Sequence, residues 1–251
     1  MNGQQPSASS RRPPGRVLGL IPAKGGSRRV ARKNLRMLAG KPMLQWTIDA
    51  ALASGRLDRV VVSTEDDEAA RVARACGADV PFRRPSHLAQ DPYGVVDVCL
   101  HALEELEREG DRFEQLVVLL PTSPFRSAHH IVAALEQFAR LGADFLMSVS
   151  ALDHSLLAAH VLRDGFMEPL HPEWIGRLGA RARDTELPRL VKANGAVTVL
   201  KVPRFREVRT YYGYPLAAYP MPWPDGLDID TEEDLLFAEA LLAAGRIGMS
   251  A

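Results

Sequence analysis

The sequence predicts an α/β fold built on a doubly wound, mostly parallel sheet. Short apolar runs of strand length recur along the chain, and segments with apolar residues at helical spacing lie between them. Strands that alternate with amphipathic helices form parallel sheets with helices on both faces. The 251 residues are enough for one large α/β domain or two small ones.

Each expected element follows from its local pattern. The apolar run at 17–22 predicts the first strand, and the apolar stripe from Leu44 to Leu52 predicts a helix that ends near Gly55. The same patterns predict a last helix after Thr231, which is suited to cap it. We expect further strands at 60–64, 116–120, 144–149, 192–200 and 217–221, and helices at 65–75, 95–106 and 128–141.

Two segments do not follow this alternation. Residues 1–16 are rich in Ser, Pro and Arg without an apolar centre, so we expect a disordered tail and not a secretory signal. At about 151–190 no helical period is sustained. A segment of this length without regular structure is usually functional. We therefore expect one domain over 17–245 that carries an insertion at about 151–190.

Composition excludes some classes of protein. Lys+Arg 31 balances Asp+Glu 31, which argues against a general nucleic-acid binder, and no apolar run is long enough to span a bilayer. The two cysteines, Cys76 and Cys99, lie in apolar settings without metal-ligand spacing. We interpret them as buried thiols of a protein in a reducing, cytoplasmic compartment.

A loop rich in cations follows the first strand. Lys24, Arg28, Arg29, Arg32 and Lys33 lie within one short span, and such a loop repels itself unless anions neutralise it. Gly25 and Gly26 would let backbone N–H groups approach phosphate oxygens. A nucleoside triphosphate is the obvious anion, because ligands of open α/β sheets bind at the carboxyl ends of strands. A solvated basic turn is the alternative.

The string Ile-Pro-Ala-Lys-Gly-Gly-Ser-x6-Lys-Asn at 21–34 resembles the nucleotide-binding signature of the CMP-sugar synthetases, the acylneuraminate or nonulosonate cytidylyltransferase family. Family members usually have Arg where this chain has Lys24, so the charge is kept and the bidentate geometry is lost. The resemblance implies a Rossmann-like nucleotidyltransferase with an inserted dimerisation region. It also implies that nucleotide is bound by Ala23, Lys24, Gly25, Gly26, Ser27, Lys33 and Asn34.

A second stretch resembles the family at 84–91, where an Arg-Pro precedes Leu-x-x-Asp. The resemblance implies that Arg84 and Asp91 approach the nucleoside. The next residues, Pro92-Tyr93-Gly94, depart from the Ser or Thr that is frequent in the family. A surface arginine is the alternative reading of Arg84.

The segment 121–126 resembles the family's Pro-Thr-Ser-Pro-Leu-Arg, and the resemblance implies that Thr122, Ser123 and Arg126 bind substrate. The same residues also suit the start of a helix, with Ser127 as its N-cap. Sialate-using members tend to have Gln at the position of Leu120, so one polar contact to the sugar is missing here.

Residues 192–198 resemble the family's Arg-x-Asn-Gly-x-x-Tyr, which implies that Lys192 meets the sugar carboxylate and Asn194 a sugar hydroxyl. In the family, the region that matches the insertion reaches a second subunit. We therefore expect a homodimer with Leu170, Trp174 and Ile175 as interface anchors. A flexible lid on a monomer is the alternative.

Asp228 and Asp230 alternate across Ile229, so an extended backbone points both carboxylates to one side. Two carboxylates on one face make a site for Mg²⁺, which prefers hard oxygen ligands beside substrate phosphates. The string Asp-Ile-Asp-Thr-x-x-Asp also resembles the family's second signature.

The resemblance implies that CTP and a nonulosonic (sialic-like) acid give a CMP-sugar and pyrophosphate. Lys24, Arg28 and Lys33 would hold the leaving phosphates, and Asp228 and Asp230 would hold Mg²⁺. Two alternatives remain: a related enzyme that uses a Kdo-like acid or a sugar phosphate, and a nucleotide-binding module without catalysis. Leu120 and Thr198 favour a modified acid of the legionaminic or pseudaminic type. We expect no nucleic-acid or membrane partner.

Overall fold

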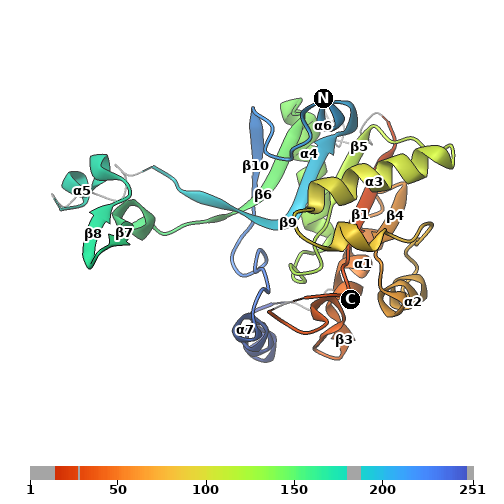
Figure 1. Ribbon diagram of the computed structural model, residues 1–251, viewed down its shortest axis with the longest axis horizontal. Coiled ribbons are helices and arrows are strands. Elements are labelled where there is room, and N and C mark those ends of the chain that lie inside the picture. The colour runs from red at the N-terminus through yellow and green to blue at the C-terminus, as the bar shows by residue number, and fades with distance from the viewer. Residues whose placement is uncertain (1–14, 28, 180–187, 248–251) are drawn as a thin grey trace, which may run out of the picture.

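The computed structural model describes residues 15–27, 29–179 and 188–247. Its centre is a six-stranded sheet with the order β10-β6-β9-β5-β1-β4 (Figure 1). Five strands run in the same direction, and β9 is antiparallel to both of its neighbours. This confirms the predicted mostly parallel sheet. The strands are β1 (Val17–Pro22), β4 (Arg59–Ser63), β5 (Gln115–Val118), β6 (Phe145–Ala151), β9 (Val191–Lys201) and β10 (Leu216–Pro220).

Helices cover both faces of this sheet. One hydrophobic cluster joins it to α1 (Met43–Ala53), α2 (Asp67–Ala75) and α4 (Ala128–Leu141), and another joins it to α3 (Val95–Arg108) and α6 (Val202–Val208). Strand β1 shows how the layers form, because successive side chains point to opposite faces. Ile21 packs in the first cluster, whereas Leu18 and Leu20 pack in the second.

A third, smaller cluster lies at the carboxyl-terminal side of the sheet. It packs α7 (Glu232–Ala243) against Leu38 and Met43, with Phe125 and Ile229 in the same cluster; Leu38 belongs to β2 (Met37–Leu38), which pairs with β3 (Lys41–Pro42). Two short 3-10 helices flank this part of the fold, η1 (Lys33–Leu35) and η2 (Ser86–Ala89). This cluster fixes the segment that contains both predicted metal-binding aspartates.

The insertion forms a unit that projects away from the sheet at the end of the extended β6 and β9 (Figure 1). It contains η3 (His154–Ala158), the antiparallel hairpin of β7 (His160–Arg163) and β8 (Phe166–Pro169), and α5 (Pro172–Gly179). We call residues 152–179 the arm. Both strands of its hairpin are exposed throughout, so no alternation of buried and exposed residues marked them in the sequence.

Most predicted elements are confirmed within a few residues. The helix at 128–141 has the predicted bounds, and α3 continues two residues beyond 106. The predicted helix at 65–75 begins later, because Asp66 is its N-cap and accepts a hydrogen bond from the Ala69 N–H. Glu65 therefore precedes the helix. None of the helices in the described residues is long and apolar enough to cross a membrane. The predicted tail at 1–16 lies outside the described residues except for its last two.

Candidate active site

A cavity of about 320 Å³ lies at the carboxyl ends of β1 and β5. A larger, open hollow of about 680 Å³ shares Lys24, Ser27 and Lys33 with it. The sequence brings four separate segments to the wall of this cavity, as the predicted ligand site at the carboxyl edge requires. They contribute Pro22, Lys24, Ser27, Arg29, Lys33 and Asn34, then Arg84, Leu88, Ala89, Asp91 and 93–95 with Val98, then 120–122, and finally Asp228 and Asp230.

The basic loop and the aspartate pair meet in this cavity. Lys33 Nζ lies 2.7 Å from Asp230 Oδ1, and Arg29 Nη2 lies 2.8 Å from Asp230 Oδ2. Lys24 is exposed on the wall and forms no ion pair with the described residues. Protein carboxylates therefore neutralise part of the loop's charge and leave Lys24 available to a bound anion. Arg28 lies outside the described residues.

The two glycines of the basic loop, which were expected to present backbone N–H groups to phosphate, differ in their surroundings. The Gly25 N–H donates to Glu65 Oε1 at 2.8 Å, so the protein already uses this donor in the present structure, and its contact with phosphate stays a prediction. A Cβ on Gly25 would lie 2.7 Å from the Asp66 side chain, which explains the glycine by close approach to the start of α2. A Cβ on Gly26 would meet nothing within 4 Å, and Gly26 lines the open hollow.

Two further residues of the signature support the loop from inside. Ala23 is buried, and its N–H donates to the Ser63 carbonyl at 2.9 Å, which continues the β1–β4 pairing. Asn34 is 8% exposed, and its Nδ2 donates to the Lys24 carbonyl at 2.9 Å. Asn34 thus fixes the backbone of Lys24 and also lines the cavity.

The Asp-Ile-Asp alternation has the geometry that its spacing predicts. Ile229 is fully buried in the third cluster, and both aspartates line the cavity. Burial of its carboxyl group raises the pKa of Asp228, a hydrogen bond from Thr122 lowers it, and Asp230 raises it again, with a net rise. Burial alone would also raise the pKa of Asp230, but Lys33 and Arg29 outweigh it and hold that pKa below its usual value.

Of the predicted substrate residues at 122–126, Thr122 alone lines the cavity. Its carbonyl accepts the Ile229 N–H at 2.7 Å, which ties it to the aspartate segment. Ser123 is buried and donates to the Asn194 carbonyl at 3.2 Å. Its hydroxyl bonds to β9 in this structure, and its predicted role in binding substrate stays a prediction.

Arg126 is also buried in the protein and not on the wall of the cavity. Its Nη1 donates to the carbonyl groups of Ala196 at 2.8 Å and Leu120 at 3.3 Å. Burial lowers the pKa of Arg126 to about 9. This guanidinium joins the 120–126 turn to β9, and its contact with substrate stays a prediction.

Lys192 and Asn194 likewise do not line the cavity. Asn194 is 4% exposed, accepts from the Ser148 hydroxyl at 2.5 Å and donates to Ser150 Oγ at 3.0 Å. Its amide is thus satisfied within the sheet in this conformation, and its contact with a sugar hydroxyl stays a prediction. Lys192 is exposed and pairs with Ser150 where β6 and β9 leave the sheet for the arm.

Arg84 is buried, so the alternative of a surface arginine is excluded. It lines the cavity and forms a salt bridge with Glu65. Asp91 is exposed on the same wall. The lining of the cavity also includes an apolar group, which we call its apolar end: Leu88, Tyr93, Val95, Val98 and Leu120. An apolar end next to a cationic end suits a ligand that has a flat base and a polyphosphate.

The aspartate pair fits a magnesium ion by the chemistry of its donors. Both groups are carboxylates that line one cavity, and Mg²⁺ is commonly bound by one or two carboxylates together with substrate phosphates and water. Among the described residues, no group of three or more His, Cys, Asp or Glu forms a metal-binding cluster. The remaining ligands would therefore be phosphate oxygens and water.

Sequence reasoning missed two residues that shape this site. Glu65 was assigned to the acidic start of a helix, whereas its carboxylate contacts both Gly25 and Arg84. Gly226 was not singled out, although a Cβ there would lie 2.4 Å from Asn194 Nδ2. The signal for Glu65 was its place directly after a buried strand, the same signal that drew attention to Lys24 and Thr122.

Comparison with known proteins gives consistent matches. The family model described as cytidylyltransferase matches residues 18–163. The CMP-N,N'-diacetyllegionaminic acid synthase of Legionella pneumophila is 30% identical over 240 residues, which cover 90% of this chain and 96% of that protein. A pseudaminic acid cytidylyltransferase of Campylobacter jejuni is 29% identical over 88% of this chain and 94% of its own.

A solved structure of CMP:2-keto-3-deoxy-manno-octonic acid synthetase complexed with CTP has the same fold, with a TM-score of 0.66 and 18% identity over 92% of this chain and 99% of that one. The structural match supports the fold, and the sequence matches support the family. The chain therefore belongs to the cytidylyltransferase family, among the CMP-nonulosonate synthetases.

Proposed function

We propose that this enzyme transfers CMP from CTP to the anomeric hydroxyl of a nonulosonic acid and releases pyrophosphate. One observation carries the proposal: Lys24 and Lys33 of the basic loop line the same cavity as Asp228 and Asp230. The hydroxyl oxygen attacks the α-phosphorus, the bond from that phosphorus to the oxygen that bridges it to the β-phosphorus breaks, and the hydroxyl proton passes to solvent. The family and the chemistry of the cavity both support this reaction.

The basic loop suits the departing end of the triphosphate. Lys24 is exposed and free of ion pairs with described residues, so its ammonium can bind the β- and γ-phosphates, where negative charge grows as pyrophosphate leaves. Lys33 is held at the same wall by Asp230. We assign Arg28 to the same phosphates from its place in the signature alone. Catalysis by these groups consists of positioning and charge neutralisation.

Asp228 and Asp230, which line the same cavity as the basic loop, would hold Mg²⁺. The bound ion would neutralise phosphate charge and make the anomeric hydroxyl more acidic. The protein's own part is to present two ionised carboxylates. Lys33 and Arg29 keep Asp230 ionised, and the hydrogen bond from Thr122 opposes the rise in the pKa of Asp228.

The apolar end of the cavity suits the cytosine base, with Tyr93 and Val95 on its wall and Arg84 beside them. The acceptor is proposed to be a legionaminic- or pseudaminic-type acid. Leu120 lines the cavity where sialate-using relatives tend to have Gln, and the relatives compared above are named for these two acids. Thr198, by contrast, is buried in β9 and does not support this choice. Turnover of a panel of nonulosonic acids with CTP tests the acceptor.

We further propose a homodimer that forms through the arm. Leu162, Phe166 and Met167 of the β7–β8 hairpin are 73%, 76% and 67% exposed. Apolar side chains that are this exposed and lie close together favour a protein–protein interface. Leu170, one of the expected anchors, is 51% exposed, whereas Trp174 and Ile175 are partly covered within the arm. Phe166→Asp should give a monomer in light scattering, while Leu236→Asp on α7, which is 65% exposed, should not.

A cytoplasmic location is also proposed. Cys76 and Cys99 are both free, as expected of a protein in a reducing compartment.

The metal role is tested by Asp230→Asn. The amide keeps the shape and removes the charge, so pyrophosphate release should fall by at least about a hundredfold while the circular dichroism spectrum is unchanged. Glu239→Gln, an exposed change on α7, is the matched control. Near-normal turnover of Asp230→Asn would refute the metal role.

The phosphate role is tested by Lys24→Ala. We expect weaker CTP binding and slower turnover, because one exposed cation of the loop is lost. Lys201→Ala, which removes a lysine paired with Asp144 at the far end of β9, should change neither. Unchanged CTP affinity and rate for Lys24→Ala would contradict the assignment of the loop.

A further inference from the structure

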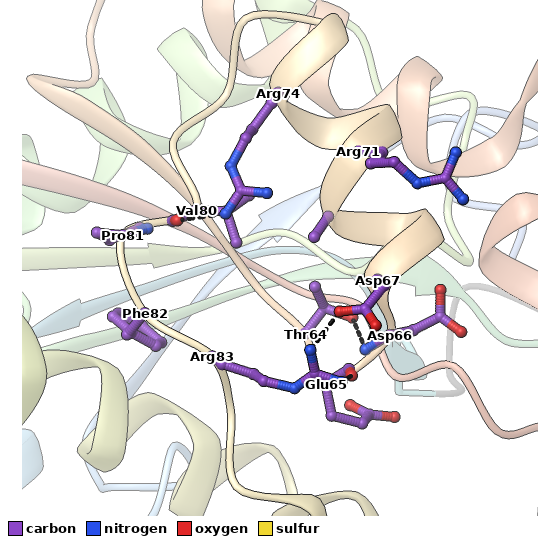
Figure 2. Close-up of a pocket in the computed structure, with 11 residues that line it drawn as sticks. Thr64, Glu65, Asp66, Asp67, Arg71, Arg74, Val80, Pro81, Phe82 and Arg83 are labelled. Atoms are coloured by element: carbon purple, nitrogen blue, oxygen red, sulfur yellow. Dashed lines mark hydrogen bonds and ion pairs between the residues drawn. The ribbon is translucent and has the colours of Figure 1, made fainter.

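A groove of about 280 Å³ lies between α2 and the segment 80–83. Figure 2 shows Arg74 reaching from α2 to the Val80 carbonyl, a hydrogen bond of 3.0 Å. Arg83 forms a salt bridge with Asp67 and donates to the Glu65 carbonyl at 2.8 Å. These two arginines are thus used to hold 80–83 against α2.

Arg84, the residue that follows the segment 80–83, lines the nucleotide cavity. The Arg84 N–H donates to the Thr64 carbonyl at 3.0 Å, which fixes its backbone beside β4. Its side chain is only 2% exposed, and that of its salt-bridge partner Glu65 is 15% exposed. Thr64 therefore fixes the backbone of Arg84, and Glu65 fixes its guanidinium, at the wall of the cavity.

The Glu65 carboxylate contacts two separate segments that bear on the cavity. Oε1 accepts the Gly25 N–H at 2.8 Å, and Oε2 accepts Arg84 Nε at 3.0 Å and also Arg84 Nη2. Gly25 directly follows Lys24, so one carboxylate joins the phosphate end of the cavity to the arginine beside its apolar end. Hydrogen bonds to an ionised carboxylate are stronger than neutral ones.

We infer that Glu65 is a positioning residue of the nucleotide site: it sets the distance between the basic loop and Arg84, and so matches the cavity to a nucleoside triphosphate. The inference rests on the proposed function. It explains why Glu65, which lies outside the basic loop and does not line the cavity, has both carboxylate oxygens committed to residues that bear on nucleotide binding.

The test uses Glu65→Gln with Asp67→Asn as the matched control. A glutamine amide has one acceptor oxygen and turns an NH₂ toward a donor, so it cannot satisfy Gly25 and Arg84 together. We expect KM for CTP to rise by about tenfold or more, with KM for the acid sugar unchanged. Glu65→Asp keeps two acceptor oxygens and should restore part of the loss. Asp67 bonds Arg83 on the groove side, and its variant should leave KM for CTP unchanged.

Two further measurements separate the possible outcomes. Amide hydrogen exchange at Gly25 should become faster in Glu65→Gln and not in Asp67→Asn, and this readout needs no turnover. In an Arg84→Gln background, Glu65→Gln should add little to the loss of CTP affinity, because the two residues act together. If the wild type releases no pyrophosphate from CTP, the proposed function fails, and Gly25 exchange still decides for or against Glu65. In an enzyme that does release pyrophosphate, an unchanged KM for CTP in Glu65→Gln, or unchanged Gly25 exchange, would overturn the inference alone.

Discussion

Replacing Gly226 with alanine should disturb the aspartate segment through a single methyl group. A Cβ on Gly226 would lie 2.4 Å from Asn194 Nδ2 and 2.6 Å from Ser150 Oγ, where ordinary contact begins at 3.4 Å. Asn194 cannot retreat easily, because its amide bonds to Ser148 and Ser150 inside the sheet. The loop that contains Gly226 must therefore move by about 1 Å.

This displacement reaches Asp228 two residues later. A misplacement of about 1 Å in a catalytic site can reduce the rate by about a hundredfold. Overpacking of a tight contact costs about 1–3 kcal/mol of unfolding free energy, which corresponds to a fall in Tm of roughly 2–12 °C for a domain of this size. Gly226→Ala should thus lose most of its turnover at a temperature where it remains folded.

The assay is pyrophosphate release from CTP and a nonulosonic acid at 25 °C, with Tm measured by circular dichroism. Gly176→Ala is the matched control, because a Cβ there would meet nothing within 4 Å. If Gly226→Ala had the turnover and Tm of the wild type, the close contact with Asn194 would not hold the loop, and the reasoning would be refuted.

Three other changes test the electrostatics and the apolar end of the site. Thr122→Val removes the hydrogen bond that lowers the pKa of Asp228, so the acidic limb of the kcat–pH profile should move to higher pH; an unmoved limb would contradict this. Tyr93→Ala should raise KM for CTP by about tenfold if the ring stacks on the base, whereas the exposed Tyr212→Ala should not. Burial lowers the pKa of His130 below its usual 6.5, so stability due to neutral His130 is present above about pH 6.5 and is lost as the pH falls. Urea unfolding should show a steeper loss between pH 7 and 5 in the wild type than in His130→Gln, and equal slopes would exclude this account.

The sequence was sufficient where function depends on position along a strand. Lys24 and Thr122 each follow a strand at the same edge of the sheet, so both were expected near a ligand and both line the cavity. The positions of Asp228 and Asp230 were predictable for a related reason. Ile229 between them is buried, so an extended backbone points both aspartates to the opposite side.

The sequence was not sufficient where a distant part of the chain supplies the partner of a polar side chain. Ser123, Arg126 and Asn194 are polar residues near strand ends, and a local pattern cannot distinguish a ligand contact from a bond inside the protein. The hydrogen-bond partners of these side chains distinguish the two cases. Arg126 donates to the Ala196 carbonyl and Ser123 to the Asn194 carbonyl, both about seventy residues away in the chain. Glu65 was missed for the complementary reason, since its two partners come from different loops.

The place where the arm joins the sheet bears on how such enzymes can diverge. Ala151 at the end of β6 pairs directly with Val191 at the start of β9, so everything between them begins and ends at neighbouring points. The entropic cost of closing a loop rises only slowly with its length. The arm can therefore be enlarged, shortened or exchanged without altering the register of β6 and β9 in the sheet. Selection can therefore act on its outer surface separately from the chemistry, much as the tip of a hairpin varies while its stem is kept.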